Sequence, residues 1–240
     1  MSEDFRVWTR GPVRWLAPNR PKKLNAWTYE MAAQLTEEFA SADADPAVAV
    51  IVLAGIGGVY SAGIDRSVLS GDVPAATPFD VEAFVRSRTP TIACVDGLAF
   101  GMGATTATAC DLRVASTRAS FTFGFVNVGI TPEWGSSYLL SRQVGLGRAM
   151  DLCLTGRTVD AQEAYRLGLV DRLVAPEEVE DVTQALAEQI AGRDAGAVQQ
   201  TKALLWAGLE AADFASSRRI ELDAAFERRH ALKAADGAGT

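Results

Sequence analysis

TPTIACVDGLAFGMGATTATACDLRVAS, residues 89–116, is the stretch that decides the fold class of this chain. Its first part, 89–97, is an apolar run typical of a buried strand, and LRVAS at 112–116 has the pattern of another strand. The small residues between them predict a tightly packed helix. A buried strand, a helix and a second strand in this order predict an α/β fold.

The segments on the N-terminal side extend this pattern. AVAVIVLAG at 47–55 predicts a strand without a polar face, as expected when helices or a second sheet cover both of its sides. Short strands are predicted at 6–9 and 13–16. The helix predicted after them carries three apolar residues at helical spacing, Met31, Leu35 and Phe39.

The C-terminal part is predicted to be mostly helical, with one short strand near 169–174. We therefore predict an α/β core over 1–192 and a C-terminal helical section over 193–240. GDVPAATP at 71–78 is the clearest loop. Helical patterns occur at 145–154, 160–167, 176–192, 196–210 and 214–233.

Composition excludes several classes of function. Of the 240 residues, 48% are hydrophobic and 22% charged, as is usual for a globular protein. A net charge of −7 disfavours nucleic-acid binding. No apolar run reaches the length of a membrane span and MSEDFRVW at 1–8 has no signal-peptide pattern, so we predict a cytoplasmic protein without a membrane partner. The three cysteines are isolated and the only histidine is His230, which disfavours disulfides, metal sites and Ser-His-Asp catalysis.

Two glycine-rich junctions between a strand and a helix stand out, YSAGID at 60–65 and GLAFGMGATT at 97–106. Such junctions leave backbone N–H groups open to a ligand oxygen, and two of them side by side can form an oxyanion hole. Close packing of a helix on a sheet explains either junction taken alone. A dinucleotide fingerprint fits poorly, because Thr106 occupies its third glycine position.

GITPEWGSSYLL at 129–140 contains a carboxylate with two possible roles. Thr131 can cap a helix, Pro132 suits its first position, and Glu133 in the first turn complements the helix dipole. This local pattern favours a structural role for Glu133. A catalytic base is the alternative.

Five motifs in order along nearly the whole chain resemble those of the enoyl-CoA hydratase/isomerase family, the crotonases. The resemblance implies a crotonase-like spiral of ββα units with a helical C-terminal section that serves oligomerisation and covers a pocket. It also implies a homotrimer or a dimer of trimers, and an acyl-CoA substrate with no further cofactor and no metal. The motifs are NRPKKLNA (19–26), YSAGID (60–65), the stretch 89–116, GITPEWGSSYLLSRQVG (129–145) and LTGRTVDAQEAYRLGLVDRLV (154–174).

The resemblance also assigns residues to the binding of the thioester. It places the first oxyanion-hole amide on Ala62 and the second on Met102, where the family usually has glycine. It further implies that CoA is bound by Lys22, Lys23, Ala62 and Ile64. The two lysines supply local positive charge in an acidic protein, and a solvated turn is their alternative role.

The positions of the carboxylates separate the possible reactions. The two glutamates of family hydratases fall on Thr105 and Phe125, neither of which can orient water as a carboxylate does. Glu133 matches the single acid/base of family Δ3,Δ2-enoyl-CoA isomerases. The resemblance therefore implies an isomerase that moves a 3,4 double bond to the 2,3 position. Its acyl pocket is expected to be lined by Phe100, Phe125 and Trp134.

Two alternatives to the isomerase stay open. One is an enoyl-CoA hydratase or another crotonase that works through an enolate, and the other is an inactive acyl-CoA-binding protein. Among the competing acids, Asp65 is expected to be structural and Asp111 to form hydrogen bonds in the turn between a helix and a strand. His230 is expected to be exposed and uninvolved.

Overall fold

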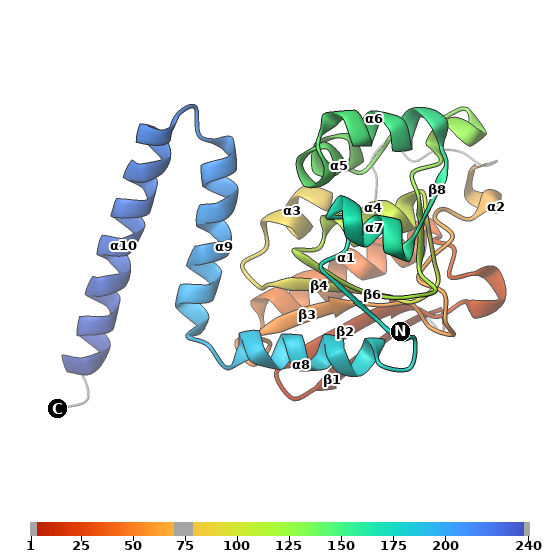
Figure 1. The fold of residues 1–240 in the computed structure, drawn as a ribbon. Coiled ribbons are helices and arrows are strands. Elements are labelled where there is room, and N and C mark those ends of the chain that lie inside the picture. Colours follow the sequence, from red (N-terminus) through yellow and green to blue (C-terminus); the bar gives the residue numbers. More distant parts are fainter. Residues whose placement is uncertain (1–3, 70–78, 238–240) are drawn as a thin grey trace.

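A mostly parallel sheet lies at the centre of the computed structural model, which describes residues 4–69 and 79–237 (Figure 1). The loop predicted at 71–78 lies outside these residues. Within them, the large sheet has the strand order β1-β2-β3-β4-β6-β9. Its first pair is antiparallel and all later pairs are parallel. The strands are β1 (Phe5–Arg10), β2 (Val13–Pro18), β3 (Val50–Leu53), β4 (Thr91–Val95), β6 (Leu112–Ser116) and β9 (Arg172–Val174).

A second, smaller sheet has the order β5-β7-β8, with a parallel first pair and an antiparallel second pair. The chain passes from the large sheet to the small one and then into a helix, in β4-β5-α4 and again in β6-β7-α5. This succession confirms the predicted α/β class. The elements are β5 (Leu98–Phe100), β7 (Ser120–Thr122), β8 (Thr158–Asp160), α4 (Met102–Ala109) and α5 (Ser136–Val144).

Both faces of the large sheet are covered, which explains why 47–55 has no polar position. Side chains alternate along a strand, so Val52 of β3 packs in the core beneath α8 (Val179–Ala191) while Ile51 and Leu53 pack in the core on the opposite face. That opposite core also holds the buried residues of α1 (Tyr29–Ala44). The helix predicted there is confirmed, because Met31, Leu35 and Phe39 are its buried residues.

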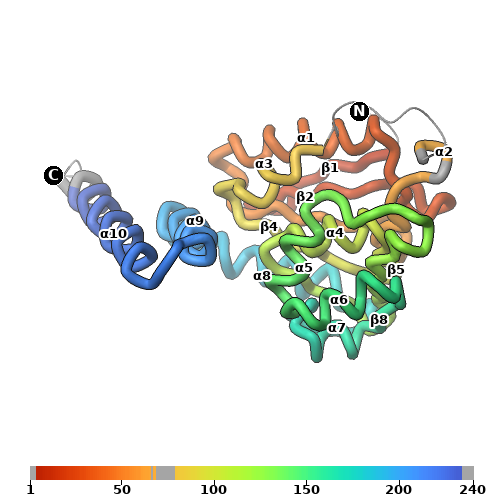
Figure 2. Tube along the Cα trace, turned by 90° about the horizontal axis from the view of Figure 1, so that it is seen from above, coloured from red at the N-terminus to blue at the C-terminus, as the bar shows by residue number. Residues whose placement is uncertain are grey.

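The C-terminal helices α9 and α10 pack side by side and stand away from the two sheets in both views (Figures 1 and 2). None of the described helices combines the length and the apolar character needed to cross a membrane. The helices after α5 lie close to the predicted segments: α6 (Leu146–Thr155), α7 (Ala161–Leu167), α8, α9 (Ala195–Glu210) and α10 (Phe214–Gly237).

Three of the short elements illustrate how the structure differs from the prediction. Leu98–Phe100 and Thr158–Asp160 form strands, because they pair with β7, a partner distant in sequence that local patterns do not show. Helix α5 begins at Ser136, not at Pro132, because Trp134 and Gly135 both have left-handed backbone angles, with φ of 57° and 73°. Glu133 therefore precedes the helix and does not lie in its first turn.

Candidate active site

The first glycine-rich junction, 60–65, lies between β5 and the segment before α1. On one side, Ser61 donates its N–H to the Leu98 carbonyl at 2.9 Å and accepts from the Phe100 N–H at 2.9 Å. On the other side, Trp27 donates its N–H to the Gly63 carbonyl at 2.7 Å. The junction is thus an extended segment held by the backbone on both sides.

The second junction begins α4. Gly101 takes a positive φ of 53°, and the N–H of Thr105 donates to the Gly101 carbonyl at 3.0 Å as the helix starts. The N–H of Met102, the first residue of α4, precedes that bond and has no acceptor among the described residues. Met102 is itself buried.

The two junctions meet at Gly63. A Cβ atom at this position would lie 2.7 Å from the Phe100 carbonyl oxygen and 3.3 Å from the Met102 nitrogen. A Cβ at Gly103 would lie 2.5 Å from the Ser61 carbonyl oxygen. Such contacts require residues without side chains, so the glycines allow the backbone of 61–64 to lie against the start of α4. The two junctions therefore lie side by side.

The open amide of the first junction differs from the one predicted. The N–H of Ala62 donates to the Leu24 carbonyl at 2.8 Å, so it is not open to a ligand. In the parallel bridge between Trp27 and Ile64, Trp27 bonds to the two neighbours of Ile64, and the N–H of Ile64 itself points to the opposite side. No described residue accepts it. The open N–H of this junction is therefore that of Ile64 and not that of Ala62, and the sequence predicts only a CoA contact for Ile64.

Glu133 lies on the segment that leads into α5, a helix in contact with α4. Its side chain is exposed, and its carbonyl accepts the Ser136 N–H at 3.0 Å. The half-buried ring of Trp134 stacks on buried Phe79, with 4.6 Å between the ring centroids and 21° between the planes. The carboxylate is therefore available to a ligand and flanked by an aromatic pair.

The positions where family hydratases have glutamates carry no carboxylate in this chain. Thr105 is buried, and its Oγ1 donates to the Gly101 carbonyl at 3.3 Å. Phe125 is buried in the same core as Met102. Phe100 is half-buried beside the chain at Gly124, since a Cβ there would lie 2.8 Å from its ring. Neither Thr105 nor Phe125 supplies an acid or a base.

Lys22 and Lys23 are exposed in a short 3-10 helix, η1 (Pro21–Lys23), next to the first junction. Leu24, which follows, accepts the Ala62 N–H, and Asn25 donates from Nδ2 to the carbonyls of Ile56 at 2.8 Å and Val59 at 2.6 Å. These bonds hold the lysine-bearing turn beside 60–65. Asn25 is a structural residue that the sequence patterns do not single out.

The competing acids have structural partners. Asp65 accepts from the Ser67 N–H at 3.0 Å and from Arg20 at 3.0 Å, and the hydrogen bonds from Ser67, followed by Arg20, hold the pKa of Asp65 below its ordinary value. Asp111 accepts from the Thr91 N–H at 2.8 Å and pairs with Lys202 at 2.8 Å. Its partners therefore lie in distant elements and not only in its own turn.

The cysteines and His230 are the other side chains with reactive groups. Burial raises the pKa of the Cys94 and Cys110 thiols to about 12, which keeps them protonated and unreactive. His230 is exposed and packs against Phe226, with 4.4 Å between the ring centroids. Within 4–69 and 79–237, no group of three or more His, Cys, Asp or Glu residues is arranged to hold a metal ion.

Comparison with known sequences identifies the family. The family model described as enoyl-CoA hydratase/isomerase matches residues 13–235. A relative from Mycobacterium tuberculosis, named a probable enoyl-CoA hydratase, is 36% identical over 228 residues, which cover 88% of this chain and 80% of the relative.

Solved structures support the same assignment. An enoyl-CoA hydratase subunit of Geobacillus kaustophilus has a TM-score of 0.91 and 30% identity, covering 98% of this chain and 93% of that one. A Thermobifida fusca enoyl-CoA hydratase structure in complex with acetoacetyl-CoA has a TM-score of 0.86 and 31% identity, covering 95% of each chain. A monofunctional enoyl-CoA isomerase of M. smegmatis has a TM-score of 0.78 and 32% identity, covering 90% of this chain and 99% of that one. The chain has the crotonase fold and belongs to the enoyl-CoA hydratase/isomerase family of acyl-CoA enzymes.

Proposed function

We propose that this enzyme is an enoyl-CoA isomerase that moves a 3,4 double bond to the 2,3 position. The observation that carries the proposal is the pair of open amides, Ile64 and Met102, at the point where the two junctions meet. Two backbone N–H groups aimed at one position stabilise the negative charge that develops on a thioester oxygen. An enolate is therefore the intermediate that this backbone favours.

Glu133 is the proposed acid/base. Its carboxylate removes a proton from C2 of the 3-enoyl thioester, and the resulting electron pair is delocalised onto the thioester oxygen as an enolate. The same carboxyl group returns the proton to C4, so the double bond ends between C2 and C3 and no atom is gained or lost. One side chain suffices, because both carbons lie within its reach. The proton transfer requires no metal or redox cofactor.

Hydration is the main alternative, since relatives such as the M. tuberculosis protein are named hydratases. Addition of water needs a group that holds and activates it. Thr105 is bonded to its own helix and Phe125 is apolar, so the positions used by family hydratases favour isomerisation. An inactive acyl-CoA-binding protein is the second alternative.

For the substrate, we propose that Lys22 and Lys23 attract the phosphates of CoA. The backbone at Ala62 and Ile64 contacts the rest of the CoA moiety. The acyl chain is proposed to lie against Phe100, Phe125 and Trp134, which belong to three separate segments. The exposed lysines and the half-buried rings of Phe100 and Trp134 support these assignments.

We further propose that the enzyme works as a homotrimer or a dimer of trimers through its C-terminal helices. Large apolar side chains are exposed along them, including Leu205 at 72%, Phe214 at 83% and Phe226 at 67%. Exposed apolar area of this kind is typical of a surface that is buried in an assembly.

The isomerase proposal is tested by incubating the enzyme with a 3-enoyl-CoA and, separately, with a 2-enoyl-CoA. The wild type should move the double bond of the first substrate, and Glu133→Gln should lower kcat for this step by about 10²- to 10⁴-fold, the range for loss of a general acid/base. Glu37→Gln, which removes an exposed carboxylate on α1, is the control and should retain wild-type turnover.

Each alternative has its own result in this experiment. Hydration of the 2-enoyl-CoA that survives Glu133→Gln contradicts the isomerase and supports a hydratase with another acid. Tight binding of CoA without turnover of either thioester indicates the inactive binding protein.

A further inference from the structure

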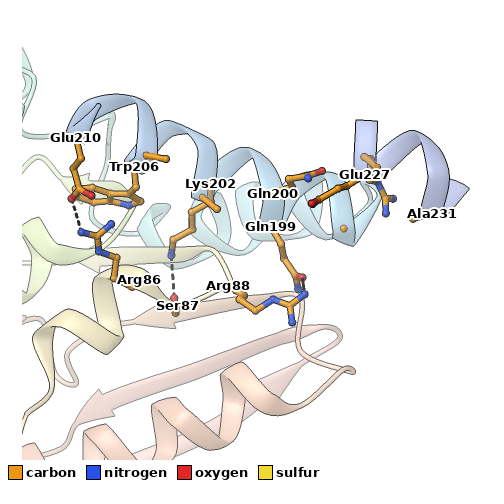
Figure 3. A pocket seen from close by; sticks show the side chains of 14 residues that line it. Arg86, Ser87, Arg88, Gln199, Gln200, Lys202, Trp206, Glu210, Glu227 and Ala231 are labelled. Atoms are coloured by element: carbon orange, nitrogen blue, oxygen red, sulfur yellow. Dashed lines mark hydrogen bonds and ion pairs between the residues drawn. The ribbon is translucent and has the colours of Figure 1, made fainter. Parts of the chain in front are cut away.

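A single carboxylate at the end of α9 contacts both elements that support the Glu133 segment. Glu210 Oε1 accepts from Arg86 Nη2 at 2.5 Å and from the Tyr138 hydroxyl at 3.0 Å (Figure 3 shows the first contact). Arg86 ends α3 (Val81–Arg86), and Tyr138 lies in the first turn of α5. Glu210 therefore connects α9 to both α3 and α5.

Two further residues of α9 contact the core from the same face: Trp206 and Lys202, four and eight residues before Glu210. Trp206 stacks with Tyr138 at 6.5 Å between ring centroids, and the Arg86 guanidinium lies 5.8 Å from the Trp206 ring. Lys202 donates to Ser87 Oγ at 3.1 Å (Figure 3). Residues at i, i+4 and i+8 share one side of a helix, so these three form a row that faces the core.

Two cavities lie between α9 and neighbouring parts of the core, which makes the contacts of this row important. One cavity of about 540 Å³ is lined by the end of α3 together with α9 and α10, and another of about 760 Å³ by α8, α9 and strand ends. Lys202 and Trp206 line both cavities. The contacts of the row, together with Gln199, which accepts from Arg88 at 2.9 Å, thus connect α9 to the core beside these cavities.

The contacts of Glu210 lead back to Glu133 by two routes. Along α5, Tyr138 lies in the turn that directly follows Trp134 and Gly135. Along α3, the Phe84 ring lies 5.6 Å from the Phe79 ring, which in turn stacks on Trp134 at 4.6 Å. Both routes end at the residues beside Glu133, so the contacts form a closed ring.

Two features of the segment around Glu133 indicate that its conformation depends on these contacts. Glu133 is exposed, so burial does not set its position, and Trp134 has a φ of 57° that is unfavourable for a residue other than glycine. A strained conformation of this kind persists where the surrounding structure determines it. The hydrogen bond from Arg86, followed by that from Tyr138, lowers the pKa of Glu210 and so favours its ionised form as the acceptor.

We propose that Glu210 is a positioning residue for the reaction: through Arg86 and Tyr138 it orients the segment that carries Glu133. The proposal rests on the proposed function, because it assigns a role toward the proposed acid/base. It also ties catalysis to the C-terminal helices, since the acid/base segment keeps its geometry only while α9 stays on the core.

The test compares Glu210→Gln, Tyr138→Phe and the double variant with wild type in the isomerase assay. Each single variant should lower kcat about tenfold and change KM less than twofold, which is the size of effect expected for coupling through packed contacts. The double variant should lose no more than Glu210→Gln alone, because the bond that Tyr138→Phe removes is one of the two that Glu210 makes. Glu227→Gln, which lines the same cavity from α10, is the control and should match wild type.

A second readout separates failure of this proposal from failure of the proposed function. Hydrogen exchange of the amides in 131–140 should be faster in Glu210→Gln than in wild type and in Glu227→Gln, at a temperature where all three are folded. If the wild type does not isomerise, the proposed function fails, and the exchange rates still decide whether Glu210 orders this segment. Unchanged exchange, or kcat losses that add in the double variant, overturns the proposal.

Discussion

Gly63 lies where the two junctions meet, at a position that cannot accommodate a side chain. Its φ is +82°, and the space that a Cβ would occupy is filled by the Phe100 carbonyl and the Met102 nitrogen. A methyl group there separates the two open amides, Ile64 and Met102. The spacing of these two amides thus depends on the absence of one side chain.

We expect Gly63→Ala to abolish isomerisation and to lower the free energy of unfolding by about 3 kcal/mol, because it combines backbone strain with a clash. Gly11→Ala is the matched control: Gly11 has a φ of +57°, but nothing lies within 4 Å of its Cβ position. It should cost only the strain, about 1 kcal/mol, and leave activity intact. Chemical denaturation and the isomerase assay measure both effects, and an active Gly63→Ala enzyme contradicts the proposed oxyanion hole.

At the scale of elements, the Asp96 carboxylate connects the ends of the neighbouring strands β4 and β6. Asp96 follows β4, and its Oδ1 accepts from Ser116 Oγ at 2.7 Å and from Arg118 Nε at 2.7 Å, at the end of β6. Burial raises the pKa of Asp96, but the hydrogen bonds from Arg118 and Ser116 outweigh it, so the pKa lies below its ordinary value. The ionised form therefore stabilises the folded state.

The sign of this linkage gives a prediction for acid unfolding. A lowered pKa means that the stabilisation is present above the unfolded pKa of about 4 and is lost as the pH falls through the folded value. We expect the free energy of unfolding of Asp96→Asn to fall less between about pH 5 and pH 3 than that of wild type. Arg118→Gln should flatten the profile in the same direction. Denaturant titrations at each pH measure it, and identical slopes for Asp96→Asn and wild type contradict the prediction.

At the scale of the whole molecule, the chain consists of a compact α/β body and a pair of helices that stands away from it (Figure 2). The body buries its strands on both faces, whereas Phe214, Phe226 and Leu205 on the helical pair are exposed. An isolated chain of this shape leaves apolar surface in water, which the proposed assembly would bury.

The assembly is tested by placing charge on that surface. Phe214→Asp combined with Phe226→Asp should shift the particle from a trimer or hexamer toward the monomer, because a charge buried in an apolar interface is unfavourable. Ala40→Asp adds a charge at an exposed position of α1 and should leave the assembly unchanged. Light scattering after size exclusion measures the mass. A monomeric wild type contradicts the proposed oligomer.

Much of the fold was predictable because its signals are local. The apolar runs at 47–55 and 89–97 and the spacing of Met31, Leu35 and Phe39 depend only on residues near in sequence, and the predicted strands and helix are found there. The short strands β5 and β8 were missed because each has three residues and is held by a partner elsewhere in the chain. Cooperative pairing, not local preference, makes them strands.

The sequence by itself determined the fold class, the family resemblance and the two glycine-rich junctions, because small residues and apolar periodicity restrict the backbone wherever they occur. Only the tertiary structure decided which amides are open. The Leu24 carbonyl accepts the N–H of Ala62, 38 residues away in the sequence, and the N–H of Ile64 stays without an acceptor among the described residues. The tertiary structure also decided that Glu133 precedes α5 and that Glu210 contacts Tyr138 from a distant helix. Whether distant segments come within hydrogen-bond distance depends on how the whole chain folds, and local sequence patterns carry no information about it.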